Sequence, residues 1–155
     1  MALTVLSGGL VIWAAAIALK DWYSHRIPNV ALVLLLVPAV LSLVVNGVGL
    51  LALPVVPSLL GFLLGGGILL PGYVLGKMGA GDVKFAACIG LLLGPQSTCK
   101  MLLMFAIALG ALSAAVWLYH RQVPGSGKRR IAAAPAMAAA FIVQLLWNPL
   151  PWNLF

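Results

Sequence analysis

Residues 61–94 read GFLLGGGILLPGYVLGKMGAGDVKFAACIGLLLG, two apolar runs joined by a short segment that carries Lys77, Asp82 and Lys84. The rest of the chain repeats this pattern of long apolar runs and short charged connections. Of its 155 residues, 64% are hydrophobic and 7% are charged, and the mean hydropathy is +1.17. This composition lies far outside the usual range of soluble globular domains, so we expect an integral membrane protein that resides in a lipid bilayer.

Six apolar stretches predict the membrane spans. A helix needs about 20 residues to cross roughly 30 Å of hydrocarbon, and an open sheet would leave backbone groups unpaired in lipid. We therefore expect an all-α, polytopic integral membrane protein with six transmembrane helices, formed by a single membrane-embedded domain over residues 1–155. The expected spans are 3–20, 29–46, 54–75, 83–99, 101–119 and 131–147.

The fourth stretch is interrupted by Gly94-Pro95, which leaves a purely apolar segment that is short for a membrane span. We expect this segment to tilt, to thin the bilayer or to end in a re-entrant turn. If it does span, its helix starts before Asp82. In the preceding stretch, the pair Gly61 and Gly65 and the pair Gly72 and Gly76 have the small-xxx-small spacing that predicts close helix packing.

The Lys and Arg residues predict the orientation of the chain. With the loops numbered in order, eight of the nine basic residues lie in the first, third and fifth loops, and Lys100 lies in the fourth. Because cytoplasmic loops carry the excess of positive charge, we expect the odd loops in the cytoplasm and both chain ends outside. The same confinement to loops argues against nucleic acid as the partner that explains a pI near 10.

Asp21 and Asp82 are the two acidic residues of the chain, and the predicted orientation places both on one face. A charged aspartate costs on the order of +2.5 to +3.5 kcal/mol at the centre of a membrane helix and less near the interface. Two carboxylates a few ångströms apart do not easily both ionise, so one acts as a base and the other as an acid. Such a pair can activate water against a peptide carbonyl and stabilise the oxyanion that forms.

Glycines distinguish Asp82 from an ordinary loop residue. It follows Gly79-Ala80-Gly81, and glycine allows both a tight turn and the close approach of another chain, as a peptide-cleaving site requires. The alternative is that both aspartates are interfacial residues paired with nearby lysines and arginines. The sequence offers no plausible Ser–His or Cys–His pair and no zinc spacing, so we expect neither a metal nor a cofactor.

Three segments resemble motifs of the type IV prepilin peptidases and of the related archaeal preflagellin peptidases. Residues 79–84, GAGDVK, resemble the family's GxGD signature followed by a basic residue. Residues 21–29, DWYSHRIPN, resemble its other aspartate motif, in which an Ile-Pro-Asn opens the next helix. Residues 135–136, Pro-Ala, are similar to the family's Pro-Ala-rich segment.

The resemblance implies an intramembrane-type aspartic endopeptidase of the bacterial inner membrane. Its implied substrate is a prepilin, a precursor with a basic leader and an apolar helix, from which the leader is cut at the cytoplasmic face. Asp21 and Asp82 are the implied catalytic pair. The residues implied to shape the site or to bind the substrate are Gly79, Gly81, Lys84, Pro28 and Asn29.

The chain departs from the larger family members, which carry a cytoplasmic insert with cysteine tetrads and also methylate the trimmed pilin. It has no such insert, and its compact length resembles the branch that serves Flp-type, tight-adherence pili, so methyl transfer is not expected. Two functions of other classes remain open. One is a small proton-coupled transporter in which the acids relay protons, and the other is a structural subunit of an assembly machine.

Overall fold

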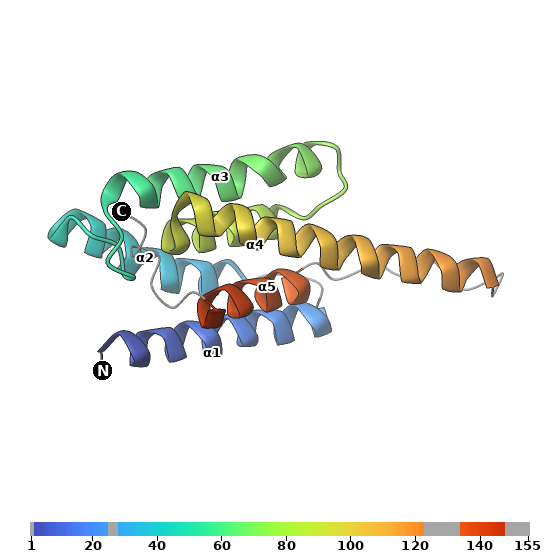
Figure 1. Ribbon diagram of the computed structural model, residues 1–155, viewed down its shortest axis with the longest axis horizontal. Helices are drawn as coiled ribbons and strands as arrows, with labels where there is room; N and C mark the ends of the chain where they lie inside the picture. The colour runs from blue at the N-terminus through green and yellow to red at the C-terminus, as the bar shows by residue number, and fades with distance from the viewer. Residues whose placement is uncertain (1, 25–27, 123–133, 148–155) are drawn as a thin grey trace.

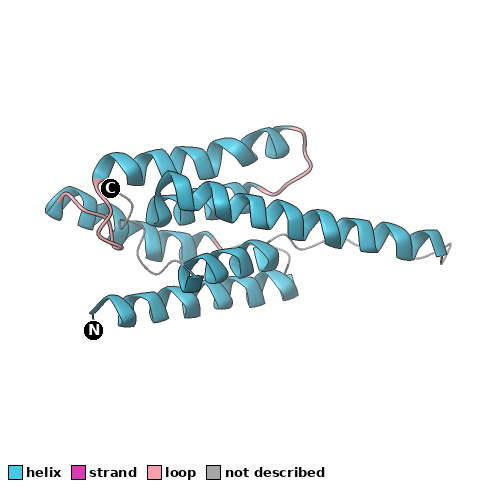
Figure 2. Cartoon of the chain, in the orientation of Figure 1, coloured by secondary structure: helices cyan, strands magenta, loops and turns pink. Residues whose placement is uncertain are grey.

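The computed structural model of the protein describes residues 2–24, 28–122 and 134–147. These residues are largely helical, as the sequence predicts, and they contain no extended strand (Figures 1 and 2). The all-α class is therefore confirmed. The helical elements are α1 (Ala2–Ser24), α2 (Asn29–Asn46), α3 (Val55–Val74), α4 (Ala80–Gln122) and α5 (Ala134–Trp147).

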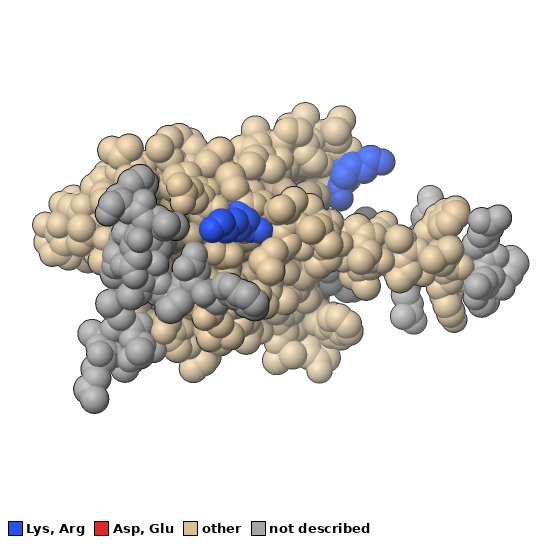
Figure 3. Space-filling view, in the orientation of Figure 1, with Lys and Arg blue, Asp and Glu red and all other residues tan. Residues whose placement is uncertain are grey.

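Three helical segments of the described chain are long and apolar enough to cross a membrane, namely Asn29–Asn46, Val55–Val74 and Ala80–Tyr119, and the last of these contains a break at Gly94. A shorter apolar helix covers Ala134–Leu146. The predicted count of six spans is not confirmed. Uncharged side chains cover most of the described surface on the face shown in Figure 3, as expected for a protein whose solvent is lipid.

Element α4 consists of two helices separated at Gly94. The backbone of Gly94 has φ 72° and ψ 176°, a conformation that glycine reaches easily, and Pro95 has no N–H with which to continue the preceding helix. We call residues 80–93 the inner arm and residues 95–122 the outer arm. The predicted boundary between residues 99 and 101 is wrong, because the break lies at Gly94 and the returning helix already contains residues 96–100.

The contact between α3 and the inner arm is made backbone to backbone. A Cβ placed on Gly61 would fall against the carbonyl of Gly90, and a Cβ on Gly65 would fall against the carbonyl of Ala86. Because the later residue of α3 meets the earlier residue of α4, the two helices are antiparallel. The packing predicted from Gly61 and Gly65 is confirmed.

The second glycine pair has a different role from the one predicted. Gly76 lies beyond the end of α3, and its φ of 67° is in the left-handed region that glycine tolerates best. It forms part of the turn between α3 and α4 and not of a helix contact. The prediction of close helix packing at Gly72 and Gly76 is therefore wrong.

The inner arm lies at the centre of the fold. Residues 85–94 are all buried, and α2, α3 and α5 pack against α4, while α1 packs against α5. The outer arm becomes largely exposed after Phe105, and its end projects past the other helices (Figure 1). The turn before α4 and the free end of the outer arm lie toward the same end of the molecule (Figure 1).

We expect Gly61→Val to destabilise the protein by about 1–3 kcal/mol, because the new side chain meets a backbone carbonyl that cannot move without separating the two helices. Thermal unfolding of the protein in detergent measures this change. Gly67→Val is the matched control, since Gly67 is on the same helix and a Cβ there meets nothing within 4 Å. Equal melting temperatures for the two variants would contradict the prediction.

Candidate active site

Asp82 lies in the first turn of α4 and is held there by Gly79. The Gly79 N–H donates a hydrogen bond of 3.2 Å to Oδ2 of Asp82, and the Asp82 N–H donates one of 3.1 Å to the Gly79 carbonyl. The carboxylate thus satisfies a backbone donor that has no partner within the helix. A Cβ on Gly79 would come within 3.3 Å of the same oxygen, so the first glycine of the signature leaves room for the aspartate.

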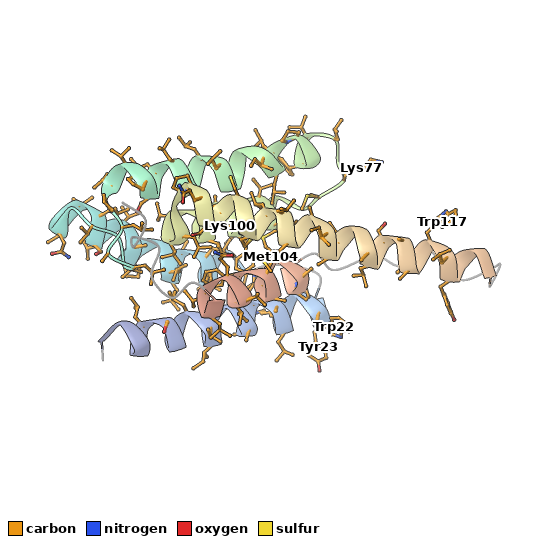
Figure 4. All side chains as sticks on the ribbon, in the orientation of Figure 1. Trp22, Tyr23, Lys77, Lys100, Met104 and Trp117 are labelled. Carbon is orange, nitrogen blue, oxygen red and sulfur yellow. The ribbon has the colours of Figure 1, made fainter. Side chains whose placement is uncertain are left out.

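Asp21 lies in the last turn of α1, because that helix extends beyond the predicted span of 3–20 to Ser24. Its side chain is only 5% exposed, whereas Trp22 and Tyr23 are 67% and 80% exposed. Figure 4 shows both aromatic side chains on the outer side of this helix end. Asp21 therefore faces the interior of the protein at the end of its helix.

Two contacts of Trp13 connect the middle of α1 to α2 and α4. Its indole N–H donates a 2.8 Å hydrogen bond to the carbonyl of Ala31 on α2, and its ring lies 5.5 Å from the ring of Phe85, centroid to centroid. Phe85 is fully buried and follows Asp82 by three residues, so it lies on nearly the same side of the inner arm. These contacts connect the helix that carries Asp21 to the helix that carries Asp82.

The structure brings the two aspartates together at one end of the molecule. The environment of the Asp82 carboxyl is set first by its partial burial, then by the hydrogen bond from Gly79, and last by the charge of Asp21. We call residues 79–81 the glycine turn. Figure 4 places Trp22, the neighbour of Asp21, and Lys77, which precedes the glycine turn by two residues, toward the same end. Two carboxyls near each other at helix ends are the groups that combined acid and base catalysis requires.

The other residues predicted for the site have more local roles. Pro28 precedes α2 with an extended conformation, and its carbonyl accepts a 3.1 Å hydrogen bond from Ala31, so it starts that helix; Asn29 is exposed at the helix's first position. Lys84 is exposed and two positions after Asp82, a spacing at which helical side chains do not face each other. Gly81 is half-buried within the turn.

Part of the second aspartate motif, residues 25–27, lies outside the described residues, as do residues 131–133 before the Pro-Ala segment. Within the described chain, no group of three or more His, Cys, Asp or Glu residues is arranged to hold a metal ion. Sequence reasoning missed the roles of Trp13 and Phe85. Their aromatic character within apolar helices was visible, but their mutual contact depends on tertiary structure.

The type IV leader peptidase family matches residues 9–124, a range that includes both aspartates and the glycine turn. The chain belongs to this family. The predicted resemblance is thereby confirmed, and the protein is a peptidase of the leader-peptidase type. No curated protein and no solved structure matches the chain.

Substitution of Gly79 by valine is expected to slow precursor cleavage on the order of 10- to 100-fold, because the side chain would push the Asp82 carboxylate away from its position. Initial rates of cleavage in membranes measure the effect. Ala80→Val adds a similar side chain at the next, exposed position of the same turn and should retain most activity. An equal loss of cleavage rate in both variants would contradict the prediction, because it would show that any larger side chain in the turn slows cleavage, whether or not it displaces the carboxylate.

Proposed function

We propose that the protein is an aspartic endopeptidase that removes the leader peptide from type IV prepilins of the Flp type at the cytoplasmic face of the bacterial inner membrane. Its single membrane-embedded domain carries Asp21 and Asp82 as the catalytic pair. The observation that supports this proposal best is that the two acidic residues of the chain lie within electrostatic range of each other at one end of the molecule.

The proposed reaction needs no covalent enzyme intermediate. The ionised carboxylate of the pair takes a proton from water as the water oxygen attacks the scissile carbonyl, and the protonated carboxyl donates a hydrogen bond to the developing oxyanion. As the tetrahedral intermediate collapses, the carboxyl that took the proton from water passes it to the leaving amine. The Gly79 N–H keeps the Asp82 carboxylate in a fixed orientation during these steps.

The arrangement favours peptide hydrolysis over proton-coupled transport. A proton relay needs ionisable groups at successive depths in the bilayer. Both acids of this chain instead lie at one end, beside a glycine turn that a peptide backbone can approach. Membership of the leader peptidase family supports the same choice.

Asp21→Asn and Asp82→Asn are each expected to lower cleavage of a prepilin on the order of 10²- to 10⁴-fold, since asparagine keeps the shape of the side chain but cannot exchange the proton. Co-expression of each variant with a precursor, followed by N-terminal sequencing of the product, measures this loss. Accumulation of the variants in the membrane should match that of the unaltered protein. Full processing by either variant would refute the proposed dyad, and normal pilus assembly without cleavage would favour a structural subunit.

The proposed orientation predicts that the glycine turn faces the cytoplasm. Lys77→Cys should react with a membrane-impermeant thiol reagent from the cytoplasmic side, and Asn46→Cys, at the end of α2, from the outside. Both variants are made with Cys99→Ser, because Cys99 is exposed while Cys88 is buried. Labelling of intact cells compared with inverted membrane vesicles distinguishes the sides, and the reverse pattern would invert the proposed topology.

A further inference from the structure

An apolar groove of about 430 Å³ lies between the C-terminal half of α3 and the outer arm of α4. Its walls include Leu69 on α3, Met78 in the turn, and Phe105, Gly110 and Ser113 on the outer arm. The volume falls within the range of ligand-binding clefts. None of the catalytic steps described above uses this groove.

One end of the groove reaches the candidate active site. Met78 lines the groove and directly precedes Gly79, whose N–H holds the Asp82 carboxylate. A chain that lies in the groove and continues beyond Met78 therefore passes beside the glycine turn. The groove therefore borders the turn that holds the Asp82 carboxylate.

The outer arm presents small side chains to this groove. Ala106, Gly110 and Ser113 are exposed and spaced four and three residues apart, so they share one face of the helix. A Cβ on Gly110 would meet nothing within 4 Å. Lipid tails are as apolar as the side chains, so the hydrophobic effect does little to bring helices together in a membrane. Small residues favour association there because they let a second helix come close.

Charge does not explain how a precursor with a basic leader would be held here. Lys20, Lys77 and Lys84 are all exposed near the end of the molecule that carries the aspartates. Their positive charge opposes that of the leader over the range of a Debye length. Attraction must therefore come largely from the part of the substrate that follows the scissile bond.

We propose that this groove binds the apolar helix of the prepilin, with the helix packed against the face formed by Ala106, Gly110 and Ser113. The inference rests on the proposed function and adds to it the element that selects the substrate. The bound helix enters the groove along the outer arm, and its N-terminal end meets the glycine turn at Met78. The peptide bond just before the helix is thereby presented to Asp82.

Gly110→Leu fills the groove and is the direct test. It should slow cleavage of a full-length prepilin on the order of 10- to 100-fold, while a short peptide that contains the leader and the scissile bond but no apolar helix should be cleaved as by the unaltered protein. Gly67→Leu is the matched control, because Gly67 is an exposed helical glycine with nothing within 4 Å and lies outside the groove.

Cross-linking provides a second test that does not depend on Gly110. Ser113→Cys, combined with Cys99→Ser and with Asp82→Asn to prevent cleavage, should form a disulfide with a cysteine placed in the apolar helix of the precursor. Gly67→Cys in the same background should not. An adduct between two copies of the protein, or capture of a photoreactive phospholipid without any precursor adduct, would assign the groove to another occupant and overturn the proposal.

The outcomes separate this inference from the proposed function. If the unaltered protein cleaves no prepilin, the proposed function fails. If it cleaves the precursor and Gly110→Leu does so as fast as Gly67→Leu, the peptidase assignment stands and the groove inference fails. An equal slowing of the precursor and of the short peptide by Gly110→Leu would also overturn the inference, because the groove would then act on catalysis and not on helix binding.

Discussion

The backbone contact between α3 and the inner arm of α4 is the constraint on which the rest of the structure depends. Gly61 and Gly65 admit the carbonyls of Gly90 and Ala86 at distances that any side chain would prevent. Helices in lipid gain little from the hydrophobic effect, so such close van der Waals contact is a principal source of their association. The contact fixes the inner arm antiparallel to α3, and it therefore fixes where the intervening turn lies and where Asp82 begins the next helix.

The break at Gly94 then determines what surrounds that turn. Because the chain reverses there, the outer arm returns along α3 toward the end of the molecule that carries Asp82. The same reversal creates the groove between α3 and the outer arm, with Met78 at the junction of groove and turn. One glycine conformation thus places a surface suited to an apolar helix beside a hydrogen-bonded carboxylate.

The sequence predicted the parts of this arrangement that depend on local patterns. The distribution of Lys and Arg predicted that Asp21 and Asp82 share one face, which stays a prediction, whereas the α3 contact predicted from the spacing of Gly61 and Gly65 is confirmed. The role of Gly76 was misassigned, because a four-residue spacing does not show whether the helix has already ended. The contact of Trp13 with Phe85 and the groove could not be predicted, since both arise from helices that are distant in the sequence.

The position of the two acids is also consistent with the chemistry proposed for them. The free energy needed to bury a charged carboxylate in the membrane is highest at the centre of the bilayer and falls toward the interface. Asp21 lies in the last turn of α1 and Asp82 in the first turn of α4, so both acids are at helix ends. At the start of α4 the backbone also offers N–H groups that have no partner within the helix, and that of Gly79 donates to Asp82. Hydrolysis of this substrate needs water at the carboxylates and a surface that holds an apolar helix beside them. A helix end near the membrane interface suits the first requirement, and the apolar groove suits the second.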